Sequence, residues 1–294
     1  MMGFLRGTAT ALVTPFSEDG VNLSVLEQLI DRQISAGVSA IVVLGSTGEP
    51  AAMSESEKKQ VIRRAVGRAN GRIKVIVGTG SNNVENAINE SLEAQNLGAD
   101  GLLCITPYCN KCTQAGLIEY YRALSQAIEI PIICYNVPSR TGVNILPATM
   151  RKIAAFPNIA GIKEASGNMA QIMETARAVR NKCELYSGDD MLNLPILAAG
   201  GSAVISVLSN LVPEEVDSTV QAALSGDFIG ANQLNDRLLP LLKACFSEAN
   251  PIPVKEGLNL LGLSAGIPRP PLTPLKKTNQ LKMMRALARF GVKR

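Results

Sequence analysis

Hydrophobic residues recur along the chain in eight short, almost uninterrupted runs, with longer segments between them. Runs of this kind are typical of parallel strands that are buried on both faces. The strands we predict are residues 8–13, 40–44, 73–77, 101–105, 130–135, 159–162, 183–186 and 203–207.

The segments between these runs repeat their hydrophobic residues every three or four positions, which predicts amphipathic helices. Ser54 and Glu57 have the spacing of a capping box, and Asn82 precedes the next helix. Glycines that allow a helix to end follow three of the segments, at Gly37, Gly71 and Gly98. The helices we predict between the strands include residues 24–36, 54–69, 82–97, 113–128 and 169–180.

Strands and helices that alternate without a linker predict an α/β fold, the (β/α)₈ TIM barrel. A doubly wound sheet is the alternative that the same alternation allows. After the last strand the helical period continues over residues 213–224, 227–246, 253–261 and 275–290. We therefore expect a catalytic barrel domain over residues 1–224 and a C-terminal helical domain over residues 225–294, which supports the barrel and holds none of the chemistry.

Composition and charge exclude several classes of protein. Hydrophobic residues make up 46% of the 294 residues and charged residues 18%, which suits a packed core and not a disordered chain. The net charge of +4 comes from basic residues scattered among acidic ones, so we expect no nucleic-acid partner. The apolar runs are too short to span a membrane, and the first of them suits a strand better than a signal peptide. A cytoplasmic protein is the expectation.

The six cysteines do not have the pattern of a disulfide framework. Cys104 and Cys134 lie inside apolar runs, where a cysteine behaves as a small hydrophobic residue. Cys109 and Cys112 form a C-x-x-C pair, but a structural zinc site needs four ligands and the chain contains no histidine. We expect neither a metal site nor a redox function there.

Residues with useful chemistry gather where the predicted strands end. The active site of a (β/α)₈ barrel lies at the C-terminal ends of its strands. The segments at those ends contain hydroxyls, phenols, one lysine and small residues, and they are 45–49, 106–108, 135–138, 163–164, 187–190 and Ile205.

Lys163 ends an apolar strand, where a charged side chain is costly. Burial lowers the pKa of a lysine and a neutral amine attacks carbonyl groups, so Lys163 is a candidate nucleophile for a Schiff base. The other interpretation is a lysine that extends from the strand end to water. Tyr135 ends the preceding strand, and its phenol either transfers protons in carbonyl chemistry or packs beneath a loop.

Two segments are candidates for binding carboxylates. Ser46 and Thr47 lie in the glycine-flanked segment 45–49, where hydroxyls and backbone N–H groups suit an anion, although a plain strand-to-helix turn has the same composition. Arg140 follows Tyr135 by five positions and is either a bidentate carboxylate ligand or an exposed loop residue.

Four motifs resemble the dihydrodipicolinate synthase branch of the pyruvate-dependent class I aldolase family. They are Gly-Ser-Thr-Gly-Glu at 45–49, Tyr-Asn-Val-Pro-Ser-Arg-Thr-Gly at 135–142, Gly-Ile-Lys-Glu-Ala at 161–165 and Ser-Gly-Asp-Asp at 187–190. The likeness extends from the Thr-Pro after the first strand to Asn-Pro-Ile-Pro-Val-Lys at 250–255. The first and third motifs are shared with sialic acid lyases and keto-deoxy sugar acid aldolases. The motif with Arg140 is more selective and points to aspartate semialdehyde as the acceptor.

The resemblance implies a carbon–carbon lyase that condenses pyruvate with L-aspartate 4-semialdehyde and yields 4-hydroxy-tetrahydrodipicolinate, in the diaminopimelate and lysine pathway. It implies that Lys163 forms the imine with pyruvate and that Tyr135 transfers protons, without a metal or an organic cofactor. The family is usually a homotetramer, a dimer of dimers. A sugar acid lyase of the same family and a pyruvate-binding pseudoenzyme are the alternatives.

The resemblance also implies the roles of the remaining site residues. Thr47 and the backbone around it hold the pyruvate carboxylate, the backbones of Gly188 and Ile205 line the pyruvate side, and Arg140 holds the semialdehyde carboxylate. The chain departs from the family at Ser46, where threonine is usual, and at Cys109, where a second tyrosine is usual. That tyrosine reaches across the dimer interface and completes a proton relay with residue 46 and Tyr135. A thiol is shorter and a weaker donor, so we expect Cys109 to affect the rate and not the reaction type.

Overall fold

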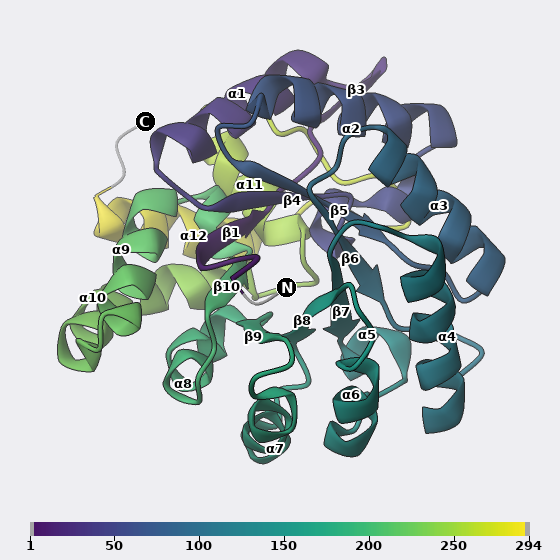
Figure 1. Ribbon diagram of the computed structural model, residues 1–294. Helices are drawn as coiled ribbons and strands as arrows, with labels where there is room; N and C mark the ends of the chain where they lie inside the picture. Colours follow the sequence, from purple (N-terminus) through teal and green to yellow (C-terminus); the bar gives the residue numbers. More distant parts are fainter. Residues whose placement is uncertain (1–2, 292–294) are drawn as a thin grey trace. The chain divides into compact units, whose positions relative to one another are not determined.

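The computed structural model describes residues 3–291, so residues 1–2 and 292–294, at the outer ends of the two expected domains, lie outside the described residues. Eight parallel strands form a closed barrel in the order β1-β10-β9-β8-β7-β6-β5-β4 (Figure 1). The predicted barrel is therefore confirmed, and a doubly wound sheet is excluded. The strands are β1 (Gly7–Ala11), β4 (Ala40–Val43), β5 (Lys74–Thr79), β6 (Gly101–Ile105), β7 (Ile132–Asn136), β8 (Ile159–Glu164), β9 (Glu184–Ser187) and β10 (Ala203–Ser206).

The predicted helices are present, with ends that differ from the expectation by one or two residues. Short helices α5, α6 and α8 and the hairpin of β2 (Phe16–Ser17) and β3 (Gly20–Val21) are additional elements that the hydrophobic period did not indicate. The helices are α1 (Leu23–Ser35), α2 (Glu55–Ala69), α3 (Val84–Asn96), α4 (Gln114–Ala127), α5 (Pro138–Thr141), α6 (Pro147–Ile153), α7 (Met169–Val179), α8 (Asn193–Ala198), α9 (Pro213–Leu224), α10 (Phe228–Cys245), α11 (Ile252–Leu260) and α12 (Lys277–Phe290). Among the described residues, no helix has both the length and the hydrophobicity that a membrane crossing needs.

A side-chain cap begins six of these helices, α1, α2, α3, α4, α7 and α10. The capping box of Ser54 and Glu57 at the start of α2 is confirmed. The expected cap of α3 was wrong by one residue, because the side chain of Asn83, and not that of Asn82, accepts the N–H of Asn86. The carbonyl of Asn82 instead accepts the side-chain amide of Asn110 at 2.8 Å.

The described residues form two compact units, the first made of residues 3–7 and 76–205. Within it, helices α3, α4, α6, α7 and α8 pack side by side in chain order outside the strands (Figure 1). The N-terminal segment is fixed to β9, since the backbone N–H groups of Gly3 and Leu5 donate to the carboxylate of Glu184 at 2.8 and 3.3 Å.

The second unit consists of residues 8–75 and 206–291. In it α10 packs against α9 and α12, and α11 packs against α12. The side chain of Asn210 donates to the carbonyl of Ala11 and accepts the N–H of Val13, which ties the end of β1 to the segment after β10. The expected boundary between residues 224 and 225 coincides with the end of α9, and the division into a barrel domain and a helical domain stays a prediction.

Gly161 of β8 has no space for a side chain. A Cβ at this position would lie 2.4 Å from the ring of Tyr186 and 2.8 Å from the carbonyl oxygen of Glu184. Tyr186 is fully buried and its hydroxyl donates to Glu184, so neither neighbour moves easily. The glycine therefore allows the tyrosine of β9 to fill the interior beside β8.

We expect Gly161→Ala to lower the free energy of unfolding by about 1–3 kcal/mol, the usual cost of overpacking a close-packed interior. The measurement is urea denaturation followed by circular dichroism. Gly67→Ala is the matched control, because that glycine lies on the exposed side of α2 with nothing within 4 Å of the methyl group that alanine would add. The control is expected to stabilise the chain by about 0.5–1 kcal/mol. Equal effects of the two substitutions would contradict the packing argument.

Candidate functional site

Lys163 lies near the end of β8, in register with Tyr135 of β7 and Tyr186 of β9. Only 6% of its surface is exposed, which argues against a lysine that extends to water. Its Nζ lies 4.3 Å from the centroid of the Tyr135 ring, and Tyr135 is itself buried. The structure thus brings together the two residues to which the sequence assigned imine and proton chemistry.

Burial lowers the pKa of Lys163 to about 8. The charge of Asp190 opposes this shift and the charge of Arg140 adds to it, but loss of solvation is the largest cause. At pH 7 roughly a tenth of such an amine is neutral, against roughly one part in three thousand at the ordinary value of 10.5. Lys163 therefore has the reactivity that a nucleophile for carbonyl carbon needs.

Gly188 leaves room for the side chain of Lys163. A Cβ at position 188 would lie 2.8 Å from both Cγ and Cε of the lysine, so only glycine fits there. The backbone N–H of Gly188 donates to the carbonyl of Glu164 at 2.8 Å and so joins the segment after β9 to β8. Ile205 is buried on β10. The residue before it, Val204, is in register with Ser187, so the backbone of Ile205 comes beside that of Gly188.

Two charged residues of the first unit act on Lys163. Arg140 lies on the short helix α5 and is exposed, so its guanidinium is accessible to a ligand. Asp190 is 5% exposed and accepts the side-chain amide of Asn193 at 3.1 Å. The sequence assigned Asp190 no role of its own, although the Ser-Gly-Asp-Asp motif contains it.

Glu164, the next residue after Lys163, is fully buried and anchors the end of β8. Both of its carboxylate oxygens accept the side-chain amide of Asn136 at 3.1 Å, and one accepts the N–H of Ser166 at 2.8 Å. Burial raises the pKa of this carboxyl group despite these bonds. Because Asn136 follows Tyr135 and Glu164 follows Lys163, the pair fixes the two strand ends that carry the candidate catalytic residues.

The segment that follows β4 belongs to the second unit and forms a tight turn, the 3₁₀ helix η1 (Ser46–Gly48). Thr47 is 3% exposed, and its hydroxyl accepts the side-chain amide of Asn250 at 2.9 Å. The hydroxyl of Thr14 donates to the carbonyl of Gly48 at 2.7 Å. Ser46 is half-buried, so the hydroxyls of this turn differ in their accessibility.

Cys109 lies in the loop between β6 and α4 and is exposed, with a backbone φ of 68°. Cys112 is half-buried, and both residues are free thiols. Burial raises the pKa of Cys112, which is the opposite of what a reactive thiolate requires.

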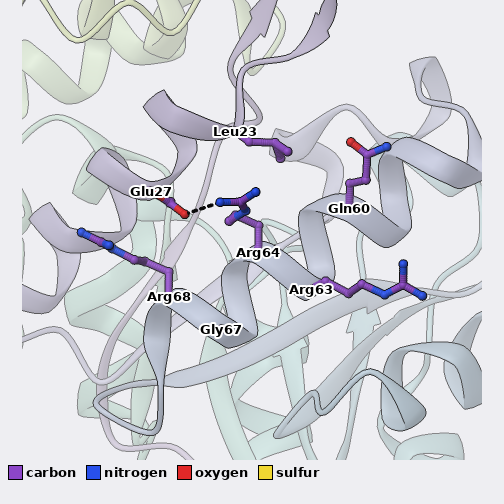
Figure 2. A pocket seen from close by; sticks show the side chains of 7 residues that line it. All are labelled: Leu23, Glu27, Gln60, Arg63, Arg64, Gly67 and Arg68. Atoms are coloured by element: carbon purple, nitrogen blue, oxygen red, sulfur yellow. Dashed lines mark hydrogen bonds and ion pairs between the residues drawn. The ribbon is translucent and has the colours of Figure 1, made fainter.

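A separate hollow of about 440 Å³ lies in the second unit on the surface of α1 and α2 (Figure 2). The Arg64 guanidinium is paired with Glu27 at 2.7 Å, and Arg68 is paired with Asp31. None of the candidate residues lines it, and exposed ion pairs of this kind carry little energy. The residues that line it are Leu23, Glu27, Gln60, Arg63, Arg64, Gly67 and Arg68.

A family model described as the dihydrodipicolinate synthetase family matches residues 4–290. The chain belongs to this family. Among its relatives, the 4-hydroxy-tetrahydrodipicolinate synthase of Caldicellulosiruptor bescii is 46% identical over 292 residues, which cover 99% of each protein.

Solved structures of the dihydrodipicolinate synthetase family superpose closely on the chain. The chloride-inhibited dihydrodipicolinate synthase of Acinetobacter baumannii, in complex with pyruvate, is 39% identical with a TM-score of 0.96, covering 98% of this chain and 100% of that one. A monomeric dihydrodipicolinate synthase variant is 39% identical with a TM-score of 0.97, covering 99% and 98%. The predicted lyase function is confirmed at the level of these names, which favour it over a sugar acid lyase or a pseudoenzyme.

The lowered pKa of Lys163 leads to a prediction about reactivity. A small acylating reagent should modify Lys163 faster as the pH rises, with a midpoint at about pH 8, because only the neutral amine reacts. Asp190 raises this pKa, so Asp190→Asn should move the midpoint to lower pH. Peptide mass spectrometry measures both, with the exposed Lys277 as an internal reference for the reagent. Glu174→Gln, on the outside of α7, is the control and should leave the midpoint in place. A midpoint that Asp190→Asn does not move would contradict the assigned charge effect.

Proposed function

We propose that the chain condenses pyruvate with L-aspartate 4-semialdehyde through a Schiff base on Lys163, giving 4-hydroxy-tetrahydrodipicolinate. The buried, partly neutral amine of Lys163 against the Tyr135 ring is the observation that carries this proposal. The amine attacks the keto carbon of pyruvate, water leaves, and the imine forms. Loss of a methyl proton then gives an enamine, whose carbon attacks the aldehyde of the second substrate. The amino group of that substrate then attacks the imine carbon, the bond to Lys163 breaks, and the ring closes as the lysine amine leaves.

Tyr135 is the proposed proton carrier of these steps. Carbinolamine formation and dehydration need a group that both donates and accepts a proton at one place, and a phenol does so. The close approach of its ring to Nζ of Lys163 supports this role. Neither a metal ion nor an organic cofactor enters the proposed reaction.

Binding of the two substrates is proposed to rest on their carboxylates. Thr47 and the backbone of its turn hold the carboxylate of pyruvate, while the backbones of Gly188 and Ile205 line the same substrate. The absence of a side chain at Gly188 supports this, because the side chain of Lys163 then lies directly against the Gly188 backbone. Arg140 holds the carboxylate of the semialdehyde, a role that suits an exposed guanidinium next to the Tyr135 strand.

The relay that Tyr135 needs is proposed to include Ser46 and Cys109. We also propose a homotetramer, a dimer of dimers, in the cytoplasm, with the barrel domain over residues 1–224 and the helical domain over 225–294. Because one of the related structures is a monomeric variant, sedimentation of this chain is the measurement that decides its assembly.

Trapping with borohydride tests the proposed chemistry. Pyruvate plus borohydride should leave a reduced, pyruvate-derived adduct on Lys163, found by mass spectrometry of the digested protein, while Lys163→Ala acquires none. Turnover of pyruvate with aspartate semialdehyde, coupled to reduction of the product, tests the full reaction, and cleavage of sialic acid or keto-deoxy sugar acids tests the alternatives. An adduct on another lysine would sink the Schiff-base assignment.

Replacement of Cys109 by tyrosine should raise kcat. A thiol ends several ångströms short of a phenol hydroxyl, and general acid–base steps are worth ~10²–10⁴-fold, so a better relay should raise kcat at least several-fold. Because Cys109 is exposed, the larger ring meets no packed interior. The KM for pyruvate should change little, since Lys163 and the Thr47 turn are intact. Cys109→Phe is the matched control, which adds the ring without the hydroxyl and should bring no gain.

A further inference from the structure

A buried ion pair joins the Ser46–Gly48 turn to helix α11. Nζ of Lys255 lies 2.9 Å from a carboxylate oxygen of Glu49, and the two side chains are 0% and 2% exposed. The other oxygen of Glu49 accepts the backbone N–H of Arg269 at 2.9 Å. Lys255 also lies 4.2 Å from the centroid of the Phe16 ring. Both charges are therefore satisfied inside the second unit.

Glu49 is directly bonded to the turn that the proposed function assigns to the pyruvate carboxylate. It caps that turn with a φ of 56°, a left-handed conformation that residues with a Cβ rarely adopt, and it precedes Pro50. Its backbone is fixed as well as its side chain, since its N–H donates to the carbonyl of Ser46 and its carbonyl accepts the N–H of Ala52. The anchored carboxylate and these bonds together hold a backbone conformation at the end of the turn that the local sequence does not favour.

The C-terminal segment reaches the turn at a second point. Asn250, which lies just before α11, donates its side-chain amide to the hydroxyl of Thr47. Lys255 and Asn250 thus act on the two sides of Gly48, one through Glu49 and the other through Thr47. The segment before α11 therefore contacts the turn, while the expectation that the C-terminal helices hold none of the chemistry stays a prediction.

We infer that Lys255 is a positioning residue, which holds the Ser46–Gly48 turn through Glu49 and so sets the affinity for the carboxylate of pyruvate. The inference rests on the proposed function. A buried ion pair is weak evidence of a stabilising role, because apolar replacements are often as stable. An apolar pair of the same size would fill the same space but would not fix the orientation of the turn.

Trapping of Lys163 with borohydride measures this affinity as the pyruvate concentration that gives half-maximal adduct. Lys255→Met should raise this concentration at least tenfold, because the turn loses its anchor. Acetone is the matched ligand: it forms an imine of the same kind without a carboxylate, so its trapping rate should be the same in parent and variant. If the substitution instead damaged the surroundings of Lys163, trapping of both pyruvate and acetone would be weakened.

The double variant Glu49→Gln and Lys255→Met removes both charges and leaves no buried carboxylate unpaired. The double variant should recover the thermal stability that Lys255→Met loses. The pyruvate concentration that gives half-maximal adduct should stay at least tenfold higher than in the parent protein. Recovery of affinity together with stability would show that the pair is merely structural and would overturn the inference. Arg64→Met, which breaks the exposed pair with Glu27, is the control and should change neither quantity.

The same experiment separates the two proposals. A parent protein that pyruvate and borohydride do not modify at Lys163 would refute the proposed function. A parent protein that is modified, with an unchanged half-maximal concentration in Lys255→Met and in the double variant, would refute the role of Lys255 alone.

Discussion

Loss of solvation around one amine is the constraint on which the site depends. A lysine at the end of an apolar strand loses the water that stabilises its ammonium form, and the pKa of Lys163 falls to about 8 as a result. Asp190 returns part of the lost stabilisation but does not reverse the shift. The pKa of this amine is therefore set by its burial together with the charges of Asp190 and Arg140.

The two consecutive residues Lys163 and Glu164 show how one strand separates reactivity from rigidity. Successive strand residues point to opposite faces, so the lysine faces the Tyr135 ring while the glutamate joins a network with Asn136 and Ser166. The glutamate uses its hydrogen bonds to fix the ends of β7 and β8. The lysine lies instead against an aromatic ring, and Gly188 leaves it space. Because the ends of β7 and β8 are rigid, the flexible side chain of Lys163 keeps one position.

The sequence predicted the barrel and the residues on single strand ends, because both follow from local patterns. Continuous apolar runs located the strands, and the position of Lys163 at the end of one run indicated its burial. The cap at Asn83 was missed by one residue, because both asparagines fit the pattern and the pattern does not determine which side chain accepts the N–H of Asn86. The pairing of Lys255 with Glu49 joins residues 206 positions apart. The hydrophobic periodicity does not indicate such a pair. It also does not indicate that Asp190 raises the pKa of Lys163.

The roles proposed for two buried lysines of this chain are opposite, and the residues around each lysine explain why. Burial lowers the pKa of both Lys163 and Lys255. Lys255 has a carboxylate at 2.9 Å, whose charge and hydrogen bond oppose the shift and favour the charged form, which suits a residue that holds a backbone turn. Lys163 faces an aromatic ring and a glycine, so its neutral form becomes accessible near neutral pH. The same residue type therefore favours its charged form beside a carboxylate and gives access to its neutral form beside an aromatic ring, which suits the proposed anchor and the proposed nucleophile.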